Sequence, residues 1–187
     1  MRFAYFDKLS RARQSIYLRS DAIESIGLPA GLALGGTVTR IAHGLREEDR
    51  AAVQSACQGL ITALVGGYHV PPVRVRVLAR RPADGYGELH GLYEPEDEGV
   101  GARITVWMRT AQKKQVVAFK TFLRTLIHEL CHHLDYELFA LEETFHTEGF
   151  YKRESSLAGA LLEQFGAEVV SGDAWPGSSG PGRGGAP

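Results

Sequence analysis

Apolar residues recur at intervals of three and four positions between residues 116 and 134, which predicts a helix with one face in a hydrophobic core. A second amphipathic helix is predicted over Glu47–Val65, with acidic residues in its first turn and the Gly66–Gly67 pair as its end. Spaced apolar residues over Phe6–Ile26 indicate a further helical region at the N-terminus. The apolar positions of the first pattern are Val116, Phe119, Phe122, Leu123, Leu126, Ile127, Leu130 and Leu134.

Three shorter segments between these helices have the pattern of β-strands. Valine alternates with arginine over Val73–Val77, which is typical of a half-buried strand. Leu89–Tyr93 and Ile104–Met108 are the other two, and the turn-forming acidic run Pro95–Gly101 separates them. The order of two helices, three strands and two helices predicts an α+β fold.

Length and composition favour a single folded unit. The chain has 187 residues, of which 44% are hydrophobic and 23% charged, as in ordinary globular domains. We expect one domain over about residues 1–170, with a helical part at about 1–67, a sheet at about 73–109 and helices at about 116–165. Residues 171–187 are rich in Gly, Pro and Ser, which predicts a flexible tail with Trp175 as its one possible anchor.

The helix predicted from residue 116 contains the sequence His128-Glu129-Leu130-Cys131-His132. Residues four apart lie on one helix face about one turn apart, so the imidazoles of His128 and His132 can converge on one metal ion. Glu129 then lies beside the ion and can act as general base for water and as acid for a leaving amine. A solvated helix flank with charged residues is the alternative.

A catalytic zinc site needs a third protein ligand, because the fourth position is kept for water. His146 follows His132 by fourteen residues, at the end of a connection long enough to return to the metal. A glutamate from the same region is the alternative ligand, with Glu143 as the reserve choice. The glutamates that could supply this ligand are Glu142, Glu143, Glu148 and Glu154.

His128-Glu129-x-x-His132 followed by His146-x-x-Gly149-Phe150 resembles the SprT-like group of zincin metallopeptidases, over about residues 100–165. The resemblance implies Zn²⁺ bound by the three histidines, Glu129 as catalytic base, and hydrolysis of a peptide or protein substrate. The metzincin pattern does not fit, because its Gly and His positions hold Asp135 and Leu138.

The resemblance also implies a zincin-like layout, in which a small twisted three-stranded sheet packs on the active-site helix and additional helices surround it. The edge strand of such a sheet can pair with an extended substrate. Ile104–Met108 and Glu88–Tyr93 are the two candidates for that edge. A purely structural sheet is the alternative.

Residues near the three histidines are expected to orient the imidazoles or to stabilise the oxyanion of the reaction. A ligating imidazole usually donates its second N–H to a carboxylate or carbonyl, and Asp135, Glu142 and Glu154 are available for this. His133 projects about 100° away from His132, so it is expected on the solvent side or beside the ligands. Candidate donors for the oxyanion of the reaction are Tyr136, Tyr151 and Arg153; the alternatives are packing for the tyrosines and a salt bridge from Arg153 to Glu148 or Glu154.

Charge and cysteine usage bear on location and partners. The formal net charge is −1, which excludes a strong overall attraction to nucleic acid or anionic membranes. Cys57 and Cys131 suggest no disulfide framework, and Cys131 is expected in the core. The N-terminus has no long apolar run, so a cytoplasmic protein with no membrane association is predicted.

Two other functions remain open from the sequence. A non-catalytic domain stabilised by the same metal ligands is one of them, although a structural zinc has no need of Glu129. A nucleic-acid-associated adaptor or protease is the other, and it would use basic clusters. These clusters are Arg109, Lys113, Lys114, Lys120 and Arg124, and Arg74, Arg76, Arg80 and Arg81, while His43, His69 and His90 stand alone outside any ligand spacing.

Overall fold

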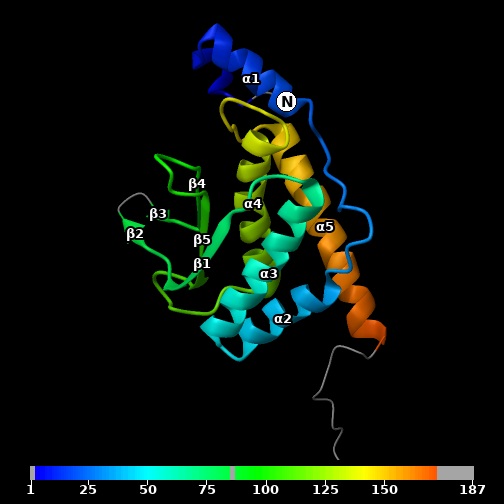
Figure 1. Ribbon diagram of the computed structural model, residues 1–187. Helices are drawn as coiled ribbons and strands as arrows, with labels where there is room; N and C mark the ends of the chain where they lie inside the picture. Colours follow the sequence, from blue (N-terminus) through cyan, green and yellow to red (C-terminus); the bar gives the residue numbers. More distant parts are fainter. Residues whose placement is uncertain (1–2, 85–86, 172–187) are drawn as a thin grey trace, which may run out of the picture.

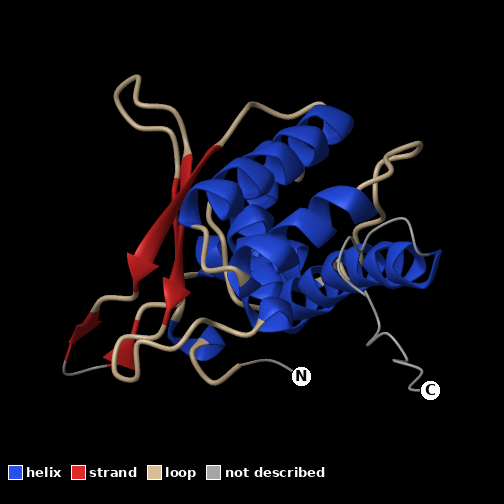
Figure 2. Cartoon of the chain, turned by 90° about the horizontal axis from the view of Figure 1, so that it is seen from below, coloured by secondary structure: helices blue, strands red, loops and turns tan. Residues whose placement is uncertain are grey.

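Strands and helices form separate layers, with the sheet on one side of a group of helices (Figures 1 and 2). The computed structural model describes residues 3–84 and 87–171. Within these residues the fold is α+β, as predicted. The helices are a 3-10 turn η1 (Phe6–Lys8), α1 (Arg11–Asp21), α2 (Gly35–Arg46), α3 (Arg50–Tyr68), α4 (Phe119–Glu137) and α5 (Glu148–Ser171); the strands are β1 (Arg74–Arg80), β2 (Ala83–Asp84), β3 (Gly87–Glu88), β4 (Gly91–Glu94) and β5 (Arg103–Arg109).

The main sheet has the strand order β1-β5-β4. β1 runs parallel to β5, with Val77 opposite Val106, and β4 runs antiparallel to it, with Tyr93 opposite Ile104. The prediction of Ile104–Met108 as the edge strand is therefore wrong: β5 is central, and all five residues are buried. The other candidate is confirmed in part, because β4 is an edge strand, whereas Glu88 belongs to the separate β2–β3 hairpin, which was not predicted.

The outer edge of β1 is covered by two glutamine side chains of α3. The amide of Gln54 donates to the carbonyl of Val75 and accepts from the N–H of Val77. Gln58 bonds the carbonyl of Val73 and the N–H of Val75 in the same way. Exposed edge strands invite pairing with other chains, so side-chain amides that bond the backbone block this edge. β4 supplies the opposite edge of the sheet.

The helices before the sheet differ from the prediction. The expected helix over Phe6–Ile26 begins only at Arg11, capped by Ser10, and ends at Asp21. The structure adds α2, which the sequence pattern did not reveal. The expected start at Glu47 is also wrong, because the Asp49 side chain accepts the N–H groups of Ala51 and Ala52 and so caps α3.

The glycine pair at residues 66–67 does not end α3, which continues to Tyr68 and stops at His69 in the left-handed conformation. A side chain at Gly67 would come within 2.6 Å of Pro29 and 3.0 Å of Leu32. Gly67 therefore allows the extended segment before α2 to pack closely against α3. The sequence could not distinguish this packing role from a helix stop.

α3 and α4 pack on the sheet and bury most of the hydrophobic core. The apolar pattern predicted for residues 116–134 is confirmed in α4, because its six members from Phe122 to Leu134 are at most 1% exposed. Val75 and Val77 of β1 point inward while Arg74 and Arg76 are exposed, as the alternation predicted. Cys131 is also in the core, as expected.

A smaller hydrophobic cluster joins the N-terminal segment to the connection between α4 and α5. Its buried members are Phe6, Tyr17 and Phe145, and Tyr5, Leu9 and Ile16 pack around them. In Figure 1 the N-terminal segment, in blue, lies at the end of the molecule where α4 gives way to this connection, in yellow. Residues far apart in sequence thus meet beside the predicted metal site.

Among the described residues, no helix combines the length and apolar content needed to cross a lipid bilayer. The predicted tail lies outside the described residues from residue 172 onward, Trp175 included, while α5 extends as far as Ser171.

The first turn of α5 touches the end of α1 so closely that only glycine fits. A Cβ at Gly149 would lie 2.2 Å from the backbone oxygen of Asp21, while the N–H of Gly149 donates to the Asp21 carboxylate. We expect Gly149→Ala to lower the free energy of unfolding by about 1–3 kcal/mol, because the backbones must separate. Urea denaturation measures this.

Gly159→Ala is the matched control, since it lies in the same helix with no atom within 4 Å of the added Cβ. It should raise stability by about 0.5–1 kcal/mol, the usual gain of alanine over glycine in a helix. Equal effects of the two substitutions would contradict the close contact between α1 and α5.

Candidate metal centre

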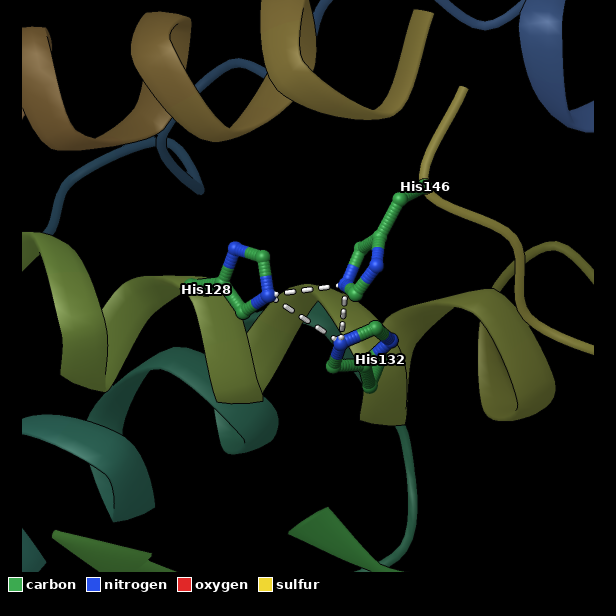
Figure 3. Close-up of side chains that lie close together, drawn as sticks. All are labelled: His128, His132 and His146. Carbon is green, nitrogen blue, oxygen red and sulfur yellow. Dashed lines mark hydrogen bonds between the residues drawn. The ribbon is translucent and has the colours of Figure 1, made fainter. Parts of the chain in front are cut away.

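Three histidines bring their ring nitrogens together at one point (Figure 3). His128 and His132 lie one turn apart on α4, and His146 belongs to the connection that precedes α5. The Nε2 atoms are separated by 3.0 Å for His128 and His146, 3.1 Å for His146 and His132, and 3.3 Å for His132 and His128. The structure therefore groups the three residues predicted as ligands, and the group could hold a metal ion.

The spacing of the nitrogens fits a small tetrahedral ion. Nitrogens about 2.0–2.1 Å from one zinc ion, at tetrahedral angles, lie about 3.3 Å from each other. The three measured separations are at or slightly below this value. A modest outward adjustment would accommodate zinc.

The second ring nitrogens show which tautomers leave Nε2 free. Nδ1 of His128 lies 3.0 Å from the carboxylate of Glu154, and Nδ1 of His132 lies 2.8 Å from Oγ1 of Thr144. Thr144 donates its own proton to Asp135, so its oxygen accepts from His132. Both imidazoles then carry the proton on Nδ1 and direct a bare Nε2 lone pair at the centre, which favours a cation there.

Electrostatics at the site also favours neutral imidazoles. Burial, together with the neighbouring rings of His128 and His146, lowers the pKa of His132 to about 3. Burial is also the main reason that the pKa of His146 is lowered. A metal ligand must be the neutral ring, so these residues are in the required state at neutral pH.

Phe150 forms the floor of the three-histidine group. Its fully buried ring lies 4.9, 4.7 and 5.2 Å from the ring centroids of His128, His132 and His146. The guanidinium of Arg153 lies 4.9 Å from the centroid of the same ring. An apolar wall behind the nitrogens keeps water from that side and limits the directions from which the centre can be reached.

Glu129 lies next to the histidines, against β4. Its side chain is 6% exposed, and a Cβ at Gly91 would come within 2.3 Å of its Oε1. Burial raises the pKa of Glu129 to about 7, although the His128 ring and the N–H of Tyr93 act in the opposite direction. The carboxyl is thus held between α4 and the edge strand β4, with an affinity for protons suited to proton transfer near neutral pH.

A cavity of about 810 Å³ leads to this group of residues. Residues 88–93 and Pro95, which include most of β4, line one wall, and Thr121, Arg124 and Thr125 of α4 line another. His128, Glu129, His132 and His146 border the same cavity, together with Tyr136 and Thr144. The centre is therefore open to a ligand that lies between the edge strand and the helix.

Of the carboxylates expected beside the imidazoles, one contacts a ring directly and another only through an intervening residue. Glu154 contacts His128, and Asp135 acts on His132 through Thr144. Thr144 itself was missed, because no sequence signal distinguishes one threonine of the connection from another. Gly91 and Tyr93 were also missed, since their importance depends on how closely β4 approaches α4.

His133 is fully buried, so its predicted place on the solvent side is wrong. Its Nε2 lies 2.9 Å from the carbonyl of Pro71, and its Nδ1 lies 3.1 Å from the hydroxyl of Tyr93. The Tyr93 ring in turn stacks with His132 at a centroid distance of 6.4 Å. His133 therefore fixes the edge strand beside the metal centre.

Arg153 is placed differently from the prediction of an oxyanion donor. It is fully buried, and it pairs with Asp135 at 2.6 Å and not with Glu148 or Glu154. Because it is enclosed behind Phe150, it does not face the cavity. From the sequence, Arg153 could be an oxyanion donor or a salt-bridge partner. The packing of α1 against α5 buries its side chain and so decides for the salt bridge.

Glu142 and Glu143 point away from the metal centre. Glu143 accepts two hydrogen bonds from Arg13, at 2.6 and 2.7 Å, and Glu142 pairs with Arg19. Neither belongs to the ligand group, so Glu143 as reserve ligand and Glu142 as a partner of the ligands are corrected. Both carboxylates lie on the outer side of the connection, where they meet the N-terminal segment.

The two candidate tyrosines lie on different sides of the histidines. Tyr136 is half-buried and borders the cavity, so it remains a candidate donor to a bound carbonyl oxygen. Tyr151 is 42% exposed and stacks on the ring of His146 at 5.8 Å. The position of Tyr151 fits packing on the outer face of the third ligand.

The basic clusters are partly neutralised. Arg81 is buried and pairs with Glu88, and Arg109 pairs with Glu48. The remaining members of both clusters are exposed, Arg124 among them at the wall of the cavity. His43, His69 and His90 lie outside the three-histidine group, as expected, although His90 borders the cavity.

Comparisons of the chain with protein-family models, with curated proteins and with solved structures found no match.

The link from His132 through Thr144 to Asp135 predicts a role in metal affinity. We expect Thr144→Val to weaken Zn²⁺ binding about 10–100-fold, because the imidazole loses the acceptor that orients it. Competition with a chromophoric chelator measures the affinity.

Thr125→Val is the control, because Thr125 borders the same cavity but its hydroxyl donates to Thr121 within α4. It should leave the affinity unchanged. Equal affinities for Thr144→Val and the unaltered protein would show that Thr144 does not orient the ligand.

Proposed function

We propose that the protein is a zinc metallopeptidase with a zincin-like active site, in which Glu129 is the general base. One observation carries the proposal. Three imidazole nitrogens converge at 3.0–3.3 Å beside a buried carboxylate, and all four residues border one open cavity. Such sites combine three protein ligands with access for water and substrate.

His128, His132 and His146 would hold the ion. When bound there, zinc would polarise the carbonyl of the substrate and increase the acidity of water. The carboxylate of Glu129 accepts a proton from the attacking water as the oxygen bonds to the carbonyl carbon. Glu129 then delivers that proton to the nitrogen as the C–N bond breaks, so the carboxylate returns to its starting state.

The remaining residues of the site have supporting roles in this proposal. Glu154 and Thr144 hold the imidazoles of His128 and His132 in the required tautomers. Tyr136 borders the cavity and is the candidate to donate a hydrogen bond to the carbonyl oxygen as its charge develops.

The substrate would be an extended peptide that lies along β4. This strand is an edge of the sheet and forms one wall of the cavity, whereas the β1 edge is blocked by Gln54 and Gln58. Pairing with backbone groups binds a chain with little regard to its sequence. The proposed substrate is therefore a protein segment without regular structure.

A metal site without catalysis is the main competing function. A structural zinc is usually enclosed by four protein ligands. Here the described residues provide three, and the fourth side opens to a cavity next to Glu129. These features favour a hydrolase.

Substitution of the base separates catalysis from metal binding. We expect Glu129→Gln to keep one zinc ion per chain while hydrolysis of quenched fluorescent peptides falls about 10²–10⁴-fold, the usual contribution of a general base. His128→Ala should lose both the metal and the activity. Zinc content by mass spectrometry and peptide turnover are the two measurements.

Undiminished turnover by Glu129→Gln would disprove its role as base. A zinc-loaded protein that cleaves none of a diverse set of unstructured peptides would favour the non-catalytic site.

The contact between Gly91 and Glu129 gives an independent test. We expect Gly91→Ala to displace the carboxylate, because the new Cβ would lie 2.3 Å from Oε1. Activity should fall about 10²-fold, the typical effect of a misplacement of about 1 Å, while zinc content is kept.

Gly101→Ala is the control, as no atom lies within 4 Å of its added Cβ. Retention of full activity by Gly91→Ala would show that β4 does not set the position of Glu129.

A further inference from the structure

The N-terminal segment, defined here as residues 3–24, contacts the connection that carries the third metal ligand. The hydroxyl of Tyr5 donates to the backbone carbonyl of His146 at 2.9 Å. Tyr17 of α1 is fully buried, and its ring lies 6.0 Å from that of Phe145. His146 is thus held through its own carbonyl and through its neighbour in sequence.

Ion pairs add to these contacts on the outer side of the connection. Arg13 binds both carboxylate oxygens of Glu143, at 2.6 and 2.7 Å, in the bidentate geometry that is strongest for arginine. Arg19 pairs with Glu142, the preceding residue. Four residues of the N-terminal segment therefore contact four of the five residues from 142 to 146.

A series of hydrogen bonds also connects the N-terminal segment to His132. Arg153 donates to the carbonyl and the hydroxyl of Ser20 and to the carboxylate of Asp135. Asp135 accepts from Thr144, whose oxygen accepts from His132. The end of α1 is thereby linked to the ring of His132 by hydrogen bonds alone.

We propose that the N-terminal segment positions the metal ligands, so that metal affinity depends on a segment that contributes no ligand. This inference rests on the metal binding of the proposed function. His128 and His132 are fixed by a helix, but His146 lies in a connection without regular structure. Contacts from outside must set its place, and ligands that are held in place before binding gain affinity. Tyr5 and Arg13 are positioning residues in this arrangement.

The decisive experiment compares two tyrosines that make the same bond. Tyr5→Phe removes the bond to His146, and Tyr68→Phe removes a 2.9 Å bond from a tyrosine hydroxyl to the carbonyl of Gly27, outside the metal site. We expect Tyr5→Phe to weaken Zn²⁺ binding about two- to tenfold, the effect of one hydrogen bond, and Tyr68→Phe to leave it unchanged. Chelator competition gives the affinity.

Thermal unfolding of the metal-free proteins supplies the second readout. If Tyr5 has a purely structural role, Tyr5→Phe should lower the melting temperature, as is expected of Tyr68→Phe, without a change in zinc affinity. That result, or equal affinities for both variants and the unaltered protein, would overturn the proposal.

A charge exchange tests the Arg13 contact separately. Arg13→Glu should weaken zinc binding, because it repels Glu143, and the pair Arg13→Glu with Glu143→Arg should restore it. Should Arg13→Glu fail to fold, the comparison of Tyr5→Phe with Tyr68→Phe decides.

Failure of this inference can be distinguished from failure of the proposed function. Lack of zinc binding by the unaltered protein would overturn both. Normal zinc-dependent hydrolysis by Tyr5→Phe, with unchanged zinc affinity, would overturn the inference alone.

Discussion

The ion pair between Arg153 and Asp135 joins α5 to α4 and links both helices to the end of α1 and to the connection that carries His146. Both side chains are fully buried, at a separation of 2.6 Å. Removing two charges from water is costly, and a buried pair is stable only where further hydrogen bonds satisfy the remaining polar atoms. Here Ser20 and Ile23 accept from Arg153 and Thr144 donates to Asp135, while among the described residues Nε of Arg153 has no hydrogen-bond partner. Loss of either charge would leave the other unpaired in the core.

The arrangement around this pair explains how a connection without regular secondary structure can hold His146 in a defined position. α4 supplies two imidazoles and the buried carboxylate of Glu129, and α5 supplies Glu154 and the aromatic floor of Phe150. The connection between them carries Thr144 and His146 and is fastened by α1. Each imidazole is thus constrained by more than one element, which is what a preorganised metal site requires.

The two edge strands of the main sheet, β1 and β4, differ in whether their outer backbone groups are covered. Gln54 and Gln58 occupy the backbone groups of β1, so that edge cannot recruit another strand. β4 instead faces the cavity, and its residue Gly91 lies against Glu129. An edge strand and a buried carboxylate are therefore neighbours, which is the arrangement that the proposed cleavage of an extended chain requires.

The sequence by itself predicted the α+β class, the buried face of α4 and the three histidines, because these depend on residue spacing along a regular helix and on the ligand chemistry of imidazole. It offered Asp135, Glu142 and Glu154 as partners of the imidazoles, and of these only Glu154 contacts a ring directly. It did not predict α2, the central position of β5, or the buried positions of His133 and Arg153. Those depend on contacts such as Gln54 with β1, Tyr93 with His133 and Ser20 with Arg153, which join residues distant in the chain. Local periodicity contains no information about such pairs, so only the tertiary structure could decide which polar residues face the cavity and which are enclosed behind it.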